Sequence, residues 1–394
     1  MSRGATPLPP PSAEPDPRTP SLERPRELPG RREAPAWLEP AAAILILLGL
    51  AARLLVSSGS VLAKDESYHL QIAGSGGWME TYRNSLTTPH PPLFFFLLNL
   101  WKRVARTGWE LRLLPIAFGV AFLWVSYLWS RRLVGRTAAL STLALTSLLP
   151  SLVLLTSEIR GYALLFLLEI GALAALERAL DEGRARFVVA FAALEALALW
   201  THYSAIFLIC AALMYSAFRV RTRRPPPAFV AAWIVSQAAL AGVFTFLVRT
   251  HITHLHGSLA ELNAKEDWLQ SSYFHRGAQG PLGFVARDTL ALATYLFSAR
   301  TAGAVALALG LVGAAGIVAQ RPSAAVLLAA PFAACAVAGL LDLYPYGGTR
   351  HDMFLAPLAC LAVAAGIGRL SGDRPWAPLA LAAALLPAAL AVAW

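Results

Sequence analysis

The sequence predicts an all-α polytopic membrane protein with about eleven transmembrane helices, and three observations lead to this fold class. Of the 394 residues, 57% are hydrophobic and only 14% are charged, whereas soluble domains average about 45–50% and about 25%. The mean hydropathy is +0.56. Apolar runs long enough for spans of about 20 residues recur along most of the chain. Together these observations exclude a soluble multidomain enzyme, a nucleic-acid reader and a disulfide scaffold.

The charge and the cysteines agree with this class. The net charge is +10, and in a polytopic membrane protein an excess of Lys and Arg marks cytoplasmic loops and contacts with anionic headgroups. We therefore expect no nucleic-acid partner. Cys210, Cys335 and Cys360 each lie alone in an apolar run, so they form neither a metal-binding spacing nor a disulfide framework.

The N-terminal segment, residues 1–36, is predicted to be a disordered cytoplasmic tail. Prolines recur through it, acidic and basic residues alternate, and apolar residues are scarce. Such a composition cannot bury enough apolar surface to order the chain. No short apolar stretch directly follows a basic start, so the segment is not a signal peptide.

Eleven apolar segments follow the tail and are predicted to span the membrane. These segments are 38–57, 111–130, 137–156, 161–178, 187–200, 203–218, 228–249, 301–319, 323–342, 352–370 and 376–394. With the N-terminus in the cytoplasm, the arginine-rich connections all fall on the inner side, which is the positive-inside bias. We therefore place the chain in the plasma or inner membrane as a multi-pass protein.

Two further apolar segments, 91–106 and 282–298, are interpreted as outer-face interfacial or re-entrant helices, because both carry charges. Counting the first alone as a span would invert every later connection, and counting both raises the total to thirteen spans.

The prediction divides the chain into four parts. They are the tail over 1–36, a transmembrane catalytic module over 37–249 with its first outer loop at 58–110, a long outer loop with an interfacial helix over 250–300, and C-terminal transmembrane helices over 301–394.

The first outer loop begins with an acidic pair, Asp65 and Glu66, three residues before His69. Two adjacent carboxylates near anionic headgroups are unfavourable unless they have a use. They could act as a general base or as oxygen ligands of a divalent metal ion. Taken alone, an exposed acidic loop is the commoner explanation.

The same loop contains a proline corner around His90, with Pro89 before it and Pro91 and Pro92 after it. A residue before proline is held in an extended backbone, and proline is well tolerated in the first helical turn. His90 is therefore presented on a rigid corner directly before an apolar, Phe-rich helix. A plain helix start explains the pattern equally well.

A third motif, Ser157-Glu158-Ile159-Arg160-Gly161-Tyr162, lies at the outer end of the third expected span. Ser157 is predicted to be the N-cap of the next helix, with Glu158 in its first turn. Capping does not explain Arg160, which so near the bilayer needs an acidic partner or a phosphate.

A fourth motif, YPYGGTRHD over 344–352, precedes the tenth expected span and includes Tyr346 and Arg350. Its two glycines permit a tight turn and a close approach of the backbone to a ligand, although a plain turn would also contain them. His202, in a short outer turn, is a weaker candidate.

Together these motifs resemble the glycosyltransferase C superfamily, most closely its family 39 branch of protein O-mannosyltransferase-like and lipid A aminoarabinose transferase-like enzymes. The resemblance is carried by the acidic pair after the first span, the HPPL corner and the E-x-R-x-Y element. It implies a catalytic base at Asp65 and a neighbouring acid at Glu66. It also implies a catalytic-site histidine at His90 and a second outer-loop acid at Glu158. The long outer loop lacks the large soluble insertion of protein mannosyltransferases.

The resemblance implies a polyprenyl-phosphate sugar donor and an acceptor on the outer face, which could be a glycan, a lipid or a protein. A single displacement would invert the anomeric centre. Asp65 would be the base, while Arg160 and Arg350, with Tyr162 and Tyr346, would hold the phosphate. The acceptor or a metal ion would contact residues of the same face, namely Glu158, His69 and His202. The alternative from another class is a non-enzymatic transporter or flippase of lipid-linked glycans, which polar residues in mid-span would favour.

Overall fold

The computed structural model describes residues 37–59, 61–222, 225–253, 267 and 269–392. The expected tail over 1–36 and most of the first part of the 250–300 loop lie outside these residues. From Trp37 onward the chain forms one unit, and every regular element in the described residues is a helix. The fold class predicted from the sequence is confirmed.

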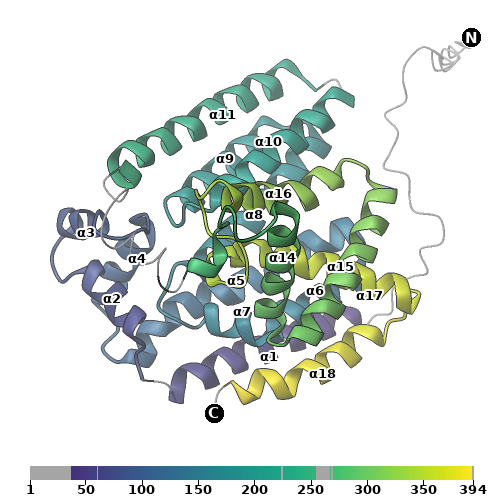
Figure 1. Ribbon diagram of the computed structural model, residues 1–394, viewed down its shortest axis with the longest axis horizontal. Helices are drawn as coiled ribbons and strands as arrows, with labels where there is room; N and C mark the ends of the chain where they lie inside the picture. Colours follow the sequence, from purple (N-terminus) through teal and green to yellow (C-terminus); the bar gives the residue numbers. More distant parts are fainter. Residues whose placement is uncertain (1–36, 60, 223–224, 254–266, 268, 393–394) are drawn as a thin grey trace, which may run out of the picture. The chain divides into compact units, whose positions relative to one another are not determined.

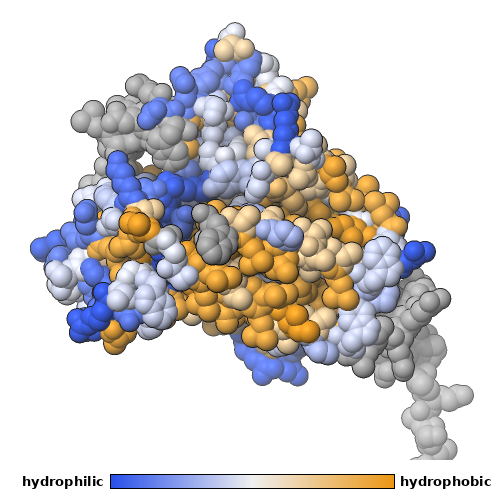
Figure 2. All heavy atoms as spheres, turned by 90° about the horizontal axis from the view of Figure 1, so that it is seen from below, coloured by the Kyte–Doolittle hydropathy of each residue, from blue (hydrophilic) through white to orange (hydrophobic). Residues whose placement is uncertain are grey.

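Helices coincide with all eleven expected spans. They are α1 (Leu38–Gly59), α5 (Gly108–Val134), α6 (Arg136–Leu148) with α7 (Pro150–Leu155), α8 (Tyr162–Glu182), α9 (Ala185–Leu199), α10 (Ala205–Thr222), α11 (Pro227–Leu247), α15 (Arg300–Gln320), α16 (Ala324–Leu340), η3 (Arg350–Leu355) with α17 (Ala356–Ser371), and α18 (Ala377–Ala391). Within the part of the chain that the structure describes, five helices are long and apolar enough to cross a bilayer, namely Leu38–Gly59, Gly108–Val134, Pro227–Ile252, Arg300–Gln320 and Arg350–Ser371. A count of eleven spans stays a prediction. Figure 2 shows a broad hydrophobic area bordered by hydrophilic residues, as expected of a membrane-facing surface.

The remaining elements lie in the two expected outer segments, except that η1 (Val248–Ile252) begins two residues before the second of them. They are α2 (Lys64–Ala73), α3 (Trp78–Ser85), α4 (Leu93–Trp101), η1, η2 (Gln270–Ser272) and α14 (Pro281–Phe297). Helices α2, α3 and α4 lie together at the left of Figure 1. With 9 residues, α4 is too short to span a bilayer, which takes about 20 residues. This length agrees with an interfacial helix.

A buried arginine holds the break between α6 and α7. Pro150 has no N–H to donate to the carbonyl of Thr146, so the helical ladder stops there. Arg53, fully buried in α1, donates instead to the carbonyl oxygens of Thr146 at 3.2 Å and Ser147 at 3.1 Å. Its Nε also donates to Thr156 Oγ1 at 2.8 Å. Arg53 therefore fixes the chain that leads into the Ser157–Tyr162 motif.

Two glycines set the closest helix contact, between α15 and α17. A Cβ added to Gly313 would lie 1.9 Å from the carbonyl oxygen of Ala362, and one added to Gly366 would lie 2.0 Å from that of Leu309. No larger residue fits at either position, so the two backbones are in direct contact there. This contact fixes η3 at one end of α17 and Arg369 at the other.

Candidate active site

Three segments that are far apart in the sequence meet around one carboxylate. Asp65, in the first turn of α2, accepts hydrogen bonds at Oδ2 from Arg160 and from Arg350, the latter at 2.8 Å. The two arginines come from the α7–α8 connection and from the start of η3. Sequence analysis places all three segments on one side of the membrane, and the structure brings them together at one end of the bundle.

The adjacent acids Asp65 and Glu66 point in different directions, because successive residues of a helix are rotated by about 100°. The Asp65 side chain is 42% exposed, whereas that of Glu66 is 1% exposed. Both lie in the first turn of α2, where a negative charge is favourable to the helix dipole. The acidic pair is therefore one open carboxylate and one buried carboxylate.

Glu66 ties the site together. Its oxygens accept from Arg112 Nε at 2.8 Å and Arg112 Nη2 at 2.5 Å. They also accept from the backbone amides of Ala63 at 2.9 Å and Ile159 at 3.0 Å. Burial raises the pKa of Glu66, but these hydrogen bonds outweigh burial and hold that pKa below its ordinary value. Glu66 thus anchors α2 to α5 and to the segment that carries Arg160.

The predicted N-cap at Ser157 is wrong. Helix α8 begins at Tyr162, with Gly161 at its N-cap position, and the Ser157 hydroxyl donates to the carbonyl of Val153 at 2.6 Å. The serine hydroxyl therefore bonds to a carbonyl of the preceding turn, and residues 157–161 form a loop between α7 and α8. The loop leaves Glu158 and Arg160 free to face the site.

The acidic partner expected for Arg160 is present twice. Besides Asp65, the guanidinium contacts Glu158, whose Oε2 lies 3.1 Å from Arg160 Nε. The Arg160 side chain is only 4% exposed, and that of Glu158 is 33% exposed. Two carboxylates thus surround one buried guanidinium, and Arg350 contacts the same carboxylate of Asp65.

The two carboxylates differ in basicity. Burial raises the pKa of Asp65, but the charges of Arg160 and Arg350 outweigh it and hold that pKa below its ordinary value. Burial also raises the pKa of Glu158, and there the charge of Arg160 does not compensate, so that pKa stays above its ordinary value. Glu158 is therefore the stronger base while Asp65 stays paired with both arginines.

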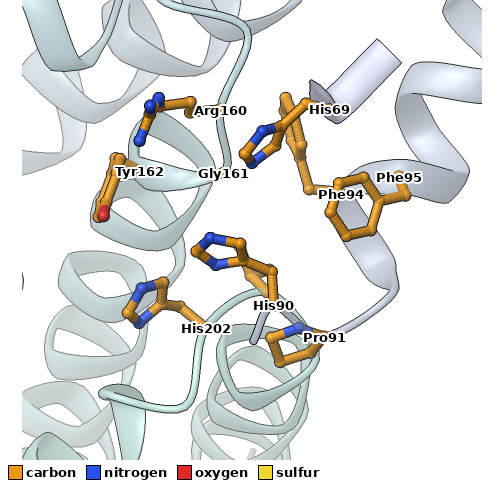
Figure 3. Close-up of a pocket in the computed structure, with 10 residues that line it drawn as sticks. His69, His90, Pro91, Phe94, Phe95, Arg160, Gly161, Tyr162 and His202 are labelled. Atoms are coloured by element: carbon orange, nitrogen blue, oxygen red, sulfur yellow. The ribbon is translucent and has the colours of Figure 1, made fainter. Parts of the chain in front are cut away.

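A histidine pocket adjoins the arginine cluster. Figure 3 shows His90 between His69 and His202, with Arg160 and Tyr162 beside them. Ring centroids are 5.3 Å apart for His69 and His90 and 5.6 Å apart for His90 and His202. The pocket volume is about 10 Å³, room for about one water molecule.

Backbone groups fix the tautomers of the two outer rings. His69 Nδ1 lies 2.8 Å from the carbonyl oxygen of Asp65, which only accepts, so Nδ1 carries the proton. His202 Nδ1 accepts from the amide of Ser204 at 3.2 Å, so its proton is on Nε2. Burial lowers the pKa of His69 and of His202 to about 4 each. Both rings are therefore neutral near pH 7.

His90 is presented as the proline corner predicts. Helix α4 begins at Leu93, directly after Pro92, and the amide of Leu93 donates to the carbonyl of Trp200 at 2.9 Å. This bond ties the corner to the end of α9, next to His202. Burial lowers the pKa of His90 well below its ordinary value.

The tyrosines expected to bind phosphate are placed differently from each other. Tyr162 lines the histidine pocket, and its buried hydroxyl has no hydrogen-bond partner among the described residues. The Tyr346 hydroxyl instead shares a 2.7 Å hydrogen bond with Thr289 of α14, and its ring packs against Phe284. The structure does not bring Tyr346 to the carboxylate cluster, because its side chain fills the contact between α14 and the 341–349 turn.

The acids and histidines do not form a metal-binding group. Among the residues that the structure describes, no set of three His, Cys, Asp or Glu side chains is placed to hold a metal ion. Glu66, one of the expected oxygen ligands, already uses both oxygens in four hydrogen bonds. The remaining donors would be Asp65, Glu158 and the nitrogens of the pocket histidines.

Sequence analysis missed Arg112 and Arg53, the two arginines that support the site from within helices. Both lie inside expected spans, where an ionisable residue is costly and therefore points to a function. That signal was available for each of them. The sequence did not identify their partners, because Glu66 and Thr156 are distant in the sequence from the arginines that contact them.

One family matches part of the chain. Residues 89–248 match the model of the dolichyl-phosphate-mannose-protein mannosyltransferase family. The match includes His90, Glu158, Arg160, Tyr162 and His202 but neither Asp65 nor Arg350. No curated protein sequence matches the chain.

Solved structures of membrane glycosyltransferases are similar to the chain. The apo oligosaccharyltransferase of Archaeoglobus fulgidus is 13% identical with a TM-score of 0.53, covering 91% of this chain and 55% of its own. ArnT from Cupriavidus metallidurans bound to undecaprenyl phosphate is 13% identical with a TM-score of 0.47, covering 84% and 59%. The arabinosyltransferase EmbB from Mycobacterium smegmatis is 16% identical with a TM-score of 0.42, covering 93% and 42%.

The chain spans only about half the length of these structures. At this level of identity, the likeness to the oligosaccharyltransferase concerns the fold. The resemblance predicted from the motifs is nevertheless confirmed: the chain is an integral membrane protein with the fold of the glycosyltransferase C superfamily, similar to its protein O-mannosyltransferase branch.

Proposed function

We propose that the chain is a membrane glycosyltransferase that moves a sugar from a polyprenyl-phosphate carrier to an acceptor hydroxyl on the outer face. The acceptor is a glycan, a lipid or a protein, and the transfer inverts the anomeric centre. The observation that carries this proposal is the shared oxygen of Asp65, held by Arg160 and Arg350. The proposed base is thereby hydrogen-bonded directly to both proposed phosphate-binding groups.

The donor phosphate would compete with Asp65 for the arginines. Guanidinium groups bind phosphate by charge and by forked hydrogen bonds, and a phosphate arriving between them would displace the single carboxylate oxygen. Asp65 would then lose the two charges that depress its pKa. The carboxylate would become a stronger base only when the donor is in place.

The chemistry needs no acid from the protein. The acceptor oxygen forms a bond to the anomeric carbon, and the bond from that carbon to the phosphate oxygen breaks. The electron pair leaves on the polyprenyl phosphate, where Arg160 and Arg350 stabilise the charge. The proton of the acceptor hydroxyl passes to Asp65. Glu66 and Arg112 hold α2 so that Asp65 faces this position.

A transfer assay tests the assignment of Asp65. Mass spectrometry of cell-envelope glycans and glycolipids, with and without the gene, identifies the sugar and the acceptor. Purified protein in nanodiscs is then supplied with that sugar on polyprenyl phosphate. Asp65→Asn keeps the size of the side chain but removes the proton acceptor, so we expect turnover to fall by roughly 10²–10⁴-fold.

Glu158→Gln is the matched control. Glu158 contacts the same arginine and has the higher pKa, so a larger loss for this variant than for Asp65→Asn would make Glu158 the base. Wild-type turnover of Asp65→Asn would remove it from catalysis. Activity lost in EDTA and restored by a divalent ion would instead indicate that the two acids hold a metal.

Transport of a lipid-linked glycan is the second candidate, because one observation favours it. Glu169 in α8 and Glu195 in α9 are fully buried, and three of their four carboxylate oxygens have no hydrogen-bond partner in the described residues. Ionisable residues inside membrane helices often mark a translocation pathway. If Glu169→Gln and Glu195→Gln abolish function in cells while Asp65→Asn does not, the chain is a transporter.

A further inference from the structure

A second pocket lies at the end of the bundle opposite the candidate active site. It has a volume of about 240 Å³ and lies between the ends of α15 and α17 and the α5–α6 junction. Its polar lining residues are Gln320, Arg369 and Asp373. Arg350 and Arg369 mark the two ends of η3 and α17, so they are roughly 28 Å apart along the axis at about 1.5 Å per residue.

Arg369 supplies the positive charge among the residues that line this pocket. In the part of the chain that the structure describes, its guanidinium has no hydrogen-bond or ion-pair partner, although Asp373 lines the same pocket. Gly316 leaves the space that the guanidinium occupies, since a Cβ there would lie 3.0 Å from Arg369 Nη1. The glycine of α15 therefore leaves room for the arginine side chain of α17 in the pocket.

The surroundings of the pocket are strongly basic. Arg131 and Arg136 pair with Glu39 at 2.9 and 3.7 Å, so their charges are partly balanced. Arg132 and Arg321 directly adjoin the lining residues Leu133 and Gln320 in the sequence, and Arg321 donates to the carbonyl oxygen of Arg132 at 3.0 Å. An excess of positive charge around a pocket between membrane helices favours an anionic headgroup.

The helices that line the pocket also carry exposed apolar side chains. Leu370 is 69% exposed and Leu311 is 66% exposed, so both can contact acyl chains. Trp376, three residues after Asp373, is 55% exposed, and tryptophan is enriched where membrane proteins meet the interface. A ligand in the pocket can thus have a charged end beside Arg369 and a hydrocarbon end beside the helices.

We propose that this pocket binds the headgroup of an anionic phospholipid that carries hydroxyl groups. Arg369 binds the phosphate, and the carboxylate of Asp373 and the amide of Gln320 bind the headgroup hydroxyls. A zwitterionic lipid offers no net charge to the arginines around the pocket. The lipid site is separate from the donor site, so it does not depend on the proposed transfer reaction.

Native mass spectrometry of the delipidated full-length protein tests this site, with phosphatidylglycerol and phosphatidylethanolamine as probes. We expect phosphatidylglycerol to bind more tightly. Arg369→Ala should weaken it by on the order of tenfold or more, because charge-assisted hydrogen bonds are lost. Arg374→Ala is the matched control, since Arg374 lies at the same end but does not line the pocket. Asp373→Asn should reduce the preference for the hydroxyl-bearing headgroup.

Three results would overturn the proposal. Arg369→Ala could bind phosphatidylglycerol as the wild type does, or the two lipids could bind equally well. Soluble glycerol 1-phosphate could compete fully at concentrations near those of the lipid, which would make the ligand a soluble phosphate. Size-exclusion profiles of each variant show whether the protein is folded, and Arg369 is exposed, so we expect them to be unchanged.

Discussion

Arg112 donates two hydrogen bonds to Glu66, from Nε to Oε1 at 2.8 Å and from Nη2 to Oε2 at 2.5 Å. Both side chains are at least 95% buried, with 5% and 1% exposed. A two-point pair of this kind fixes orientation as well as distance. Because Glu66 also accepts from the amide of Ile159, the pair sets the position of the loop that carries Glu158 and Arg160.

Glu66→Gln should therefore destabilise the protein more than it impairs chemistry. Removing one partner leaves the other charge buried and uncompensated, which costs about 3–5 kcal/mol. The apparent melting temperature in detergent, followed by fluorescence-detected size exclusion, should fall clearly for Glu66→Gln. Asp65→Asn is the control and should change it little, because Asp65 is the open acid of the pair.

The double variant Glu66→Leu with Arg112→Met separates the two roles. Apolar replacement of both partners removes the unpaired charge, so stability should recover toward the wild type. Activity should stay low, because α2 is no longer anchored to the loop of Arg160. A fully active double variant would show that the pair does not position Asp65.

The acid limb of the pH profile reports which carboxylate is the base. A base works only when deprotonated, so activity is lost as pH falls through its pKa. The free enzyme holds the pKa of Asp65 below its ordinary value, so kcat/KM should persist to lower pH than an ordinary aspartate allows. The acid limb of kcat, which reports the donor complex, should lie at higher pH. In that complex the two arginines bind the donor phosphate, so they no longer lower the pKa of Asp65.

Arg350→Gln checks this assignment with one change. It removes one of the two charges that lower the pKa of Asp65, so the acid limb of kcat/KM should move to higher pH. If Glu158 were the base, the wild-type limb would lie above the ordinary range of glutamate, since burial raises that pKa. A limb that stays in place in Arg350→Gln would contradict the role of Asp65.

Much of the fold could be predicted from the sequence, because apolar runs and arginine-rich connections are local signals. Each expected span coincides with a helix, and the corner at Pro92 begins α4 as the prolines predict. The N-cap at Ser157 was wrong because a turn carbonyl, that of Val153, competed successfully for the hydroxyl. Such competition depends on the path of the loop and leaves no trace in the spacing of residues.

The candidate site was predictable by residue type but not by pairing. Asp65, Arg160 and Arg350 were each identified from their motifs, yet only the structure shows them on one oxygen atom. The sequence did not show that contacts within the protein occupy Glu66 and Tyr346, because these residues carry the same sequence signal as Asp65 and Tyr162. Burial distinguishes them, and burial is set by contacts with distant helices.

Replacing either arginine by lysine tests phosphate binding. Arg160→Lys and Arg350→Lys keep the charge but lose the fork of two donors. Loss of a charge-assisted hydrogen bond costs about 1.5–3 kcal/mol, so kcat/KM for the donor should fall by roughly 10-fold to 150-fold. Full activity of both alanine variants would exclude these residues from the site.

Arg160 and Arg350 should differ in one respect. The Arg160 side chain is 4% exposed and also contacts Glu158, whereas that of Arg350 is 30% exposed. Arg160→Lys should therefore lower stability as well as activity, while Arg350→Lys should act on activity alone. Thermal melts beside the transfer assay would reveal the difference.

Cysteine labelling in intact cells tests which end of the bundle faces outward. Cys335 and Cys360 are buried, so only Cys210 must first be replaced. Thr87 and Arg221 are both exposed, and they lie on opposite sides in the predicted topology. An impermeant maleimide should label Thr87→Cys directly and Arg221→Cys only after the membrane is opened, because the positive-inside bias places the arginine-rich connections in the cytoplasm. Labelling of Arg221→Cys but not of Thr87→Cys would reverse the orientation, and would put Asp65 and its two arginines on the cytoplasmic face.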